Sequence, residues 1–156
     1  MGAPPILSAD ELLFLRLLHE KRVDYLVVGL AAAALQGAPL VTQDVDLWFR
    51  DLSDPNLVEA LHAVGGAYVP PVGLNPPTLA GAAVRLFDVV VHLHGLRPFA
   101  DERAEAAIVD VEGVPVPVLP LARIIASKRA LGREKDRVVL PLLDEALRVR
   151  QDREKR

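Results

Sequence analysis

Two aspartates separated by a single residue are the feature of this sequence that most directly suggests chemistry. Asp44 and Asp46 lie in Thr42–Arg50, a segment whose pattern predicts a strand. Residues two apart in a strand project from the same face, with Cα atoms roughly 6.5 Å apart. Two like charges at that distance need compensation, and carboxylate oxygens are the ligands that hard divalent cations prefer. The pair therefore indicates a site for Mg²⁺ or Mn²⁺.

A third carboxylate, Asp88, stands inside the β-patterned segment Ala83–His94, at a position where a core strand would carry an apolar residue. We expect this strand to lie beside that of Asp44 and Asp46, so that the three carboxylates form one cluster. Such a cluster can hold two Mg²⁺ ions about 3.5–4 Å apart, as enzymes of phosphoryl transfer do. The alternative is purely structural: Asp44 and Asp46 flank the start of a strand, and Asp88 forms a salt bridge.

The segment before the aspartates has the pattern of a phosphate-binding turn. Val23–Val28 predicts a buried strand, Gly29 ends it, and Leu30–Gln36 predicts a short helix rich in Ala and Leu. Free backbone N–H groups and the helix dipole favour an anion at such a helix start. A strand–Gly–helix turn alone is weak evidence, but the carboxylates that follow about fifteen residues later make it specific.

The rest of the chain predicts the elements that must position these residues. Ser8 and Glu11 have capping-box spacing for a first helix; Ser53 is a candidate cap for a later one. We expect helices over Ala9–Lys21, Asp54–Val64, Ala100–Ala107, Leu121–Leu131 and Glu134–Arg150, and Pro141 should start or kink the last of them. Tyr68–Gly81 predicts a loop or mobile lid. Ile108–Val118 predicts a hairpin that turns at Glu112–Gly113, with Pro115 and Pro117 confining its second arm to a sheet edge. The predicted fold is a single α/β domain, residues 1–156, with a mixed sheet of about four or five strands and flanking helices.

Composition excludes several function classes. The chain has no Cys, which rules out disulfides, thiolate catalysis and Cys-ligated zinc. It has no apolar run long enough to cross a membrane and no signal-peptide pattern, so we expect a cytoplasmic protein. Net charge is −3, yet Arg123–Arg156 holds 11 Lys and Arg against 6 Asp and Glu. This basic end could meet a phosphate-rich partner or form a solvated helix face.

Three stretches together carry a resemblance to a known family: Tyr25–Gly29 with Ala32–Gly37, then Thr42–Leu47, and finally Lys128–Arg137 followed by Leu140–Leu143. With Asp88, they resemble the nucleotidyltransferase superfamily. The closest group consists of small bacterial nucleotidyltransferase-like proteins related to abortive-infection toxins of type IV toxin–antitoxin systems. The resemblance extends from about Val23 to Leu147.

The resemblance implies a role for each matched residue. Gly29, with Leu30 and Thr42 beside the site, would bind the nucleotide phosphates; Asp44, Asp46 and Asp88 would bind the metal and act in catalysis; and Lys128, Arg133 and Asp136 would assist nucleotide binding. The implied activity is Mg²⁺- or Mn²⁺-dependent transfer of a nucleotidyl group from a nucleoside triphosphate (NTP) to a hydroxyl of RNA, a protein or a small molecule. The implied partner is a cognate antitoxin or another protein.

Three departures from the family pattern support another interpretation. Leu30 stands where the family turn has a second small residue, Leu40 where an Arg is common, and Val139 where a second acidic residue often occurs. The alternative is a nucleotide-binding or regulatory module that has lost turnover. Two further alternatives concern single residues: His92 and His94 would extend the polar face of Asp88 or bind a metal, and Trp48 would stack on a base or pack in the core.

Overall fold

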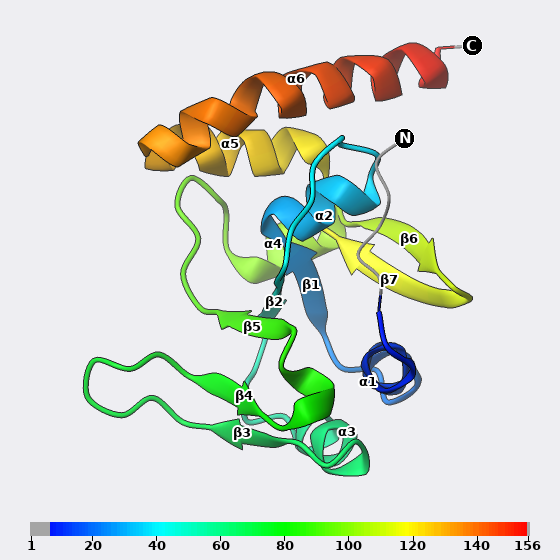
Figure 1. Ribbon diagram of the computed structural model, residues 1–156, viewed down its shortest axis with the longest axis vertical. Coiled ribbons are helices and arrows are strands. Elements are labelled where there is room, and N and C mark those ends of the chain that lie inside the picture. Colours follow the sequence, from blue (N-terminus) through cyan, green and yellow to red (C-terminus); the bar gives the residue numbers. More distant parts are fainter. Residues whose placement is uncertain (1–6, 156) are drawn as a thin grey trace.

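The computed structural model describes residues 7–155 as a mixed five-stranded sheet with helices around it and a separate two-stranded sheet (Figure 1). The elements are α1 (Ala9–Glu20), β1 (Tyr25–Val28), α2 (Gly29–Leu35), β2 (Val45–Phe49), α3 (Pro55–Ala63), β3 (Ala67–Val69), β4 (Thr78–Ala80), the 3₁₀ turn η1 (Ala82–Val84), β5 (Phe87–Val90), α4 (Phe99–Ala104), β6 (Ala107–Val111), β7 (Val114–Val118), α5 (Leu121–Leu131) and α6 (Glu134–Glu154). The α/β class and the strand number predicted from the sequence are confirmed. No described helix is both long and apolar enough to cross a bilayer.

The main sheet has the strand order β5-β2-β1-β7-β6. β1 is antiparallel to β2 and parallel to β7, while β2 and β5 are parallel. Helices α2, α5 and α6 stack at one end of the sheet, and α1 and α3 lie near the other (Figure 1). All four residues of β1 are buried, as expected of the central strand. This order and register place the end of β1, the start of β2 and the start of β5 next to one another.

The local signals in the sequence explain most element boundaries. Ser8 caps α1 through the predicted capping box with Glu11. Gly132 ends α5 in the left-handed conformation that favours glycine. For α3 the predicted cap is wrong: Asp54 caps the helix by accepting from the Asn56 N–H, and the Ser53 hydroxyl donates to Asp51 instead. Pro141 lies inside α6, seven residues after its start, so it does not begin the helix.

The second arm of the predicted hairpin is not a sheet edge. β7 lies between β1 and β6, and β6 is the edge strand on that side of the sheet. The Leu119 N–H donates to the Val27 carbonyl at 2.9 Å, so the nitrogens of Pro117 and Pro115, which alternate with it, face the β1 side. There β7 pairs with β1 only at Val118. The prolines therefore shorten the pairing with β1 and leave the pairing with β6 intact.

Two other predictions need correction between residues 67 and 94. The predicted loop over Tyr68–Gly81 is correct only for residues 70–77, because the residues on either side of them form β3 and β4, which pair as an antiparallel hairpin. Ala83–His94 is not one strand: η1 occupies its start, and β5 ends at Val90. His92 and His94 therefore lie beyond the strand, where their rings pack edge to face at 4.9 Å. The predicted strand was correct only for the residues that pair with β2, Phe87 to Val90.

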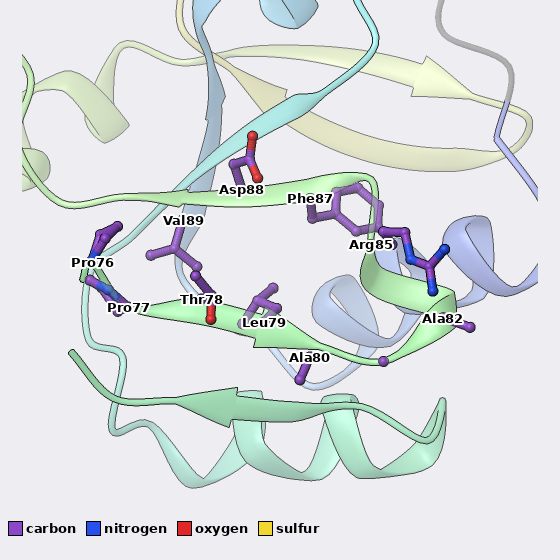
Figure 2. A pocket seen from close by; sticks show the side chains of 11 residues that line it. Pro76, Pro77, Thr78, Leu79, Ala80, Ala82, Arg85, Phe87, Asp88 and Val89 are labelled. Atoms are coloured by element: carbon purple, nitrogen blue, oxygen red, sulfur yellow. The ribbon is translucent and has the colours of Figure 1, made fainter. Parts of the chain in front are cut away.

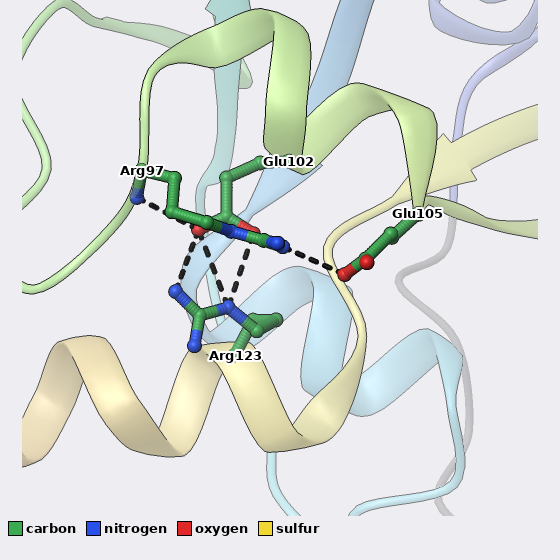
Figure 3. A network of polar contacts seen from close by, with 4 residues as sticks. All are labelled: Arg97, Glu102, Glu105 and Arg123. Carbon is green, nitrogen blue, oxygen red and sulfur yellow. Dashed lines mark hydrogen bonds and ion pairs between the residues drawn. The ribbon is translucent and has the colours of Figure 1, made fainter.

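A charged cluster of four residues joins α4 to α5 (Figure 3). Glu102 is fully buried and accepts hydrogen bonds from Arg97 and Arg123, at 2.8–3.2 Å. Arg97 also pairs with the exposed Glu105 at 2.7 Å. Burial alone would raise the pKa of Glu102, but the hydrogen bonds from Arg123 and Arg97 lower it to about 2. The carboxylate is thus charged and saturated with donors, which suits a structural role.

Replacing Glu102 with Gln is expected to lower the free energy of unfolding by about 3 kcal/mol, because it leaves two arginines without their buried anion. The matched control is Glu105→Gln, an exposed partner of the same Arg97, for which we expect less than about 1 kcal/mol. Since the pKa of Glu102 is lowered on folding, its contribution is present above about pH 4.5 and is lost as the pH falls toward 2. Urea denaturation measures both variants; equal effects would contradict the assignment.

Candidate active site

Asp46 is the centre of the candidate site. It is the second residue of β2, directly opposite Val28 of β1 on one side and Asp88 of β5 on the other. Because Asp46 and Asp88 are paired across adjacent parallel strands, their side chains project from the same face of the sheet. The strand neighbours predicted from the sequence for these two aspartates are therefore confirmed. Asp46 is partly buried, whereas Asp88 is exposed.

Asp44 occupies the residue immediately before β2, so it lies at the entrance of the strand and not within it. Its side chain is exposed. The Thr42 hydroxyl donates to the Asp44 carbonyl at 2.9 Å and thereby fixes the turn into the strand. In this structure Thr42 thus shapes the backbone next to the carboxylates.

Neighbouring aspartates raise the pKa values of Asp46 and Asp88. The pKa of Asp46 is raised, chiefly by burial and then by the charge of Asp88, with a smaller contribution from Asp44; the charge of Lys128 acts in the opposite direction. The pKa of Asp88 is raised by burial and by the charge of Asp44. The cluster therefore carries repulsion that the neighbouring Lys128 only partly offsets. A divalent cation would relieve that repulsion.

The donor set fits a hard cation in chemistry, since it consists of carboxylates alone. The side chains as placed do not form a ready-made cage: within residues 7–155, no three His, Asp or Glu side chains are close enough together to hold a metal ion. Asp44, Asp46 and Asp88 remain the residues that would bind one, and the metal site stays a prediction.

Gly29 lies close to the carboxylate of Asp46. Its φ is +67°, and a Cβ built at this position would lie 2.8 Å from the Asp46 Oδ2. The conformation therefore favours glycine, and any larger residue would displace the Asp46 carboxylate. No side chain caps the start of α2, so its first backbone N–H groups have no side-chain partner within the described chain. The predicted phosphate-binding turn at Gly29 therefore lies next to Asp46, one of the predicted metal ligands.

Lys128 of α5 approaches the site from the side of the helices. Its charge acts on Asp46, and its Nζ lies 3.6 Å from Oδ1 of Asp136, at the start of α6. Asp136 is almost completely buried and accepts from the backbone and the guanidinium of Arg133, at 2.7–3.2 Å. The structure therefore gives Asp136 internal partners and places it behind Lys128. Arg133 is exposed apart from this pairing.

The three departures from the family pattern have different surroundings. Leu40 and Val139 pack against the hydrophobic core, while Leu30 is half-buried in the first turn of α2. Trp48 packs edge to face on Phe99 of α4 at 5.1 Å, which favours the core role over base stacking. Two positions where the family often has a charged residue are thus used for packing.

The sequence analysis did not anticipate a pocket that borders Asp88. It has a volume of about 500 Å³ and lies between β5 and the β3–β4 hairpin (Figure 2). Its lining includes Arg85, which forms no ion pair or hydrogen bond with any residue that the structure describes. The sequence could have marked Arg85 as a candidate site residue, because it is the sole Asp, Glu, Lys or Arg between Glu59 and Asp88.

Comparison with known proteins shows the fold. No protein-family model matches the chain, and no curated protein matches it by sequence. Among solved structures, it is similar to ANT(2'')-Ia in complex with adenylyl-2''-tobramycin, with a TM-score of 0.61, 16% identity and 86% of each chain covered. A solution structure of the antibiotic-resistance factor ANT(2'')-Ia gives 0.58 at 14% identity, covering 86% of this chain and 80% of that one. A nucleotidyltransferase-like protein from Paracoccidioides brasiliensis gives 0.56 at 19% identity, covering 92% and 78%. The chain therefore has a nucleotidyltransferase-like fold.

Proposed function

We propose that this protein is a divalent-metal-dependent nucleotidyltransferase that moves a nucleotidyl group from an NTP to an acceptor hydroxyl. The observation that carries the proposal is the closeness of the Gly29 turn to the carboxylate of Asp46, which pairs with Asp88 across the sheet. It supports a phosphate site beside the three aspartates, in a fold shared with nucleotidyltransferases.

The proposed reaction assigns a distinct task to each residue. The Gly29 turn and Lys128 bind the triphosphate, and Asp44, Asp46 and Asp88 would hold Mg²⁺ or Mn²⁺, which supplies charge neutralisation when bound. The acceptor oxygen forms a bond to the α-phosphorus, the bond from that phosphorus to the bridging oxygen breaks, and pyrophosphate leaves. The hydroxyl proton passes to the Asp88 carboxylate. Asp136 holds Lys128 and Arg133 in place.

A nucleotide-binding or regulatory module without turnover is a second candidate. The burial of Leu40 and Val139 against the core favours it, because neither position can supply the charged side chain often found there in the family. Nucleotide binding without product, across acceptors that include RNA, protein and small molecules, would identify such a module. A toxin–antitoxin pairing stays a prediction from the resemblance; co-expression with the product of the neighbouring reading frame tests it.

A thermal-shift titration with each NTP, with and without Mg²⁺ or Mn²⁺, tests the proposed site. A ligand at 100 times its Kd stabilises by about 2.7 kcal/mol, which should raise the Tm by about 5–10 °C in a chain of this length. We expect a metal-dependent rise that Asp44→Asn abolishes. Asp110→Asn on β6, at the opposite edge of the sheet, is the matched control and should keep it. No rise with any NTP would contradict the proposal.

A further inference from the structure

The order of the strands places the pocket beside Asp88 on the far side from the nucleotide residues. Gly29 follows β1, Asp46 lies in β2, Asp88 lies in β5, and β5 is the edge strand of the sheet. The pocket begins at the free edge of β5. Given the proposed function, a molecule in the pocket would approach the carboxylates from the side opposite the triphosphate. That is the direction from which an acceptor must come.

The free edge of β5 gives the pocket backbone hydrogen-bonding groups. The Leu86 carbonyl accepts from the Val45 N–H at 2.9 Å, so the backbone groups of Leu86 face β2. Because successive residues of a strand point their N–H and C=O groups to opposite sides, those of Phe87 and Val89 face away from β2. Both residues line the pocket. Figure 2 shows Asp88 and Val89 on opposite sides of β5, so the pocket, which both residues line, borders the strand on two sides.

Most of the side chains that line the pocket are apolar, and one is a cation. Pro76 and Pro77 lie at one end of the gap between β4 and β5, and Arg85 lies at the other (Figure 2). Leu79 and Val89 lie between them. Apart from Asp88, no lining residue is acidic. Nothing in these walls would compensate several positive charges on a ligand, whereas Arg85 is available for an anionic group.

We infer that this pocket is the acceptor site and that it selects a small hydroxyl compound with an apolar ring and an anionic group. The inference rests on the proposed function and specifies its substrate class. A volume of about 500 Å³ is in the usual range of small-molecule sites. The apolar walls hold the ring, Arg85 binds the anion, and the hydroxyl is presented toward Asp88. A polycationic acceptor such as tobramycin does not suit these walls.

A single introduced thiol makes the pocket measurable without knowledge of the natural acceptor. Because the chain has no cysteine, Thr78→Cys places one thiol on the pocket wall. Ala67→Cys is the matched control, since it is exposed on the same hairpin and does not line the pocket. The readout is the rate of alkylation by iodoacetamide. The probes share a phenol and differ in charge: 3-(4-hydroxyphenyl)propionate is anionic and tyramine is cationic.

We expect the anionic probe to halve the alkylation rate of the Thr78→Cys variant at a concentration at least tenfold below that needed with tyramine or tobramycin. The rate of the Ala67→Cys control should not change, and Arg85→Gln in the Thr78→Cys chain should remove the preference. Equal or better protection by a cation, a preference for the anionic probe that survives Arg85→Gln, or no protection by any probe would each overturn the inference. The NTP titration is independent of this pocket. An NTP shift without protection refutes the acceptor assignment alone. Protection without a shift refutes the nucleotidyltransferase, and the pocket is then a binding site for the anionic phenol and not an acceptor site.

Discussion

Replacing Asp46 with Asn is expected to abolish metal-dependent NTP stabilisation and to make the protein itself more stable. The two effects have one cause. Burial and the charge of Asp88 raise the pKa of Asp46, so its ionised form costs free energy in the folded protein. Asn cannot ionise, so this cost disappears together with the proposed metal ligand. We expect a gain of about 1 kcal/mol at neutral pH, the size of a typical single stabilising substitution.

The pH dependence gives this prediction a sign that can be checked. A carboxyl group whose pKa is raised on folding favours the folded state most below its ordinary pKa of 3.8, and loses that contribution as the pH rises through the folded value. The stability advantage of Asp46→Asn should therefore be absent at low pH and increase toward neutrality. Urea denaturation across this range measures it, with Asp110→Asn as the exposed control.

The loss of function should be large in the same variant. Removal of one preorganised electrostatic group typically lowers turnover by about 10²- to 10³-fold. We expect nucleotidyl transfer to fall by at least that factor, and the NTP-induced rise in Tm to vanish. A variant that is destabilised and still binds NTP with metal would contradict the assignment of Asp46, because a purely structural aspartate would behave in that way.

The residues with the strongest local constraints were the ones that the sequence predicted well. Gly29 follows a fully apolar strand and precedes a run of helix formers, so its turn could be located without the structure. Asp88 was identified because it interrupts an apolar run, and its strand does pair with that of Asp46. In both cases the deviation from an ordinary pattern marked the position.

Features that depend on tertiary contacts could not be obtained in this way. The sequence could not show that Pro115 and Pro117 direct their nitrogens toward the start of β1, where little pairing is lost. The strands β3 and β4, on either side of the proline-rich loop, were missed because each has only three residues. The partners of Asp136 likewise become visible only when α5 and α6 are placed together.

Replacing Gly29 with Ala is expected to reduce NTP binding and transfer by more than about tenfold and to lower the free energy of unfolding by about 2 kcal/mol. A left-handed φ costs a residue with a Cβ roughly 1–2 kcal/mol. In addition, the new Cβ would lie 2.8 Å from the Asp46 Oδ2, so the carboxylate must move away from its place beside the turn. This displacement of the Asp46 carboxylate is what should disturb the proposed metal and phosphate sites.

Gly37 offers a matched control at the other end of α2. Its φ is also positive, at +97°, but a Cβ there would meet no atom within 4 Å. Gly37→Ala should therefore lose stability through its backbone alone and should keep the NTP-induced rise in Tm. If both alanine variants lose that rise equally, general destabilisation explains the result and Gly29 has no special role.

A double-mutant cycle separates the two contributions at Gly29. In an Asp46→Ala background the opposing carboxylate is absent, so Gly29→Ala should retain its conformational cost and lose its steric cost. We expect a coupling free energy of about 1 kcal/mol between the two substitutions, which is in the range for residues in direct contact. A coupling near zero would mean that the carboxylate yields freely to the added methyl group. In that case the contact between Gly29 and Asp46 could not fix the geometry on which the proposed triphosphate site depends.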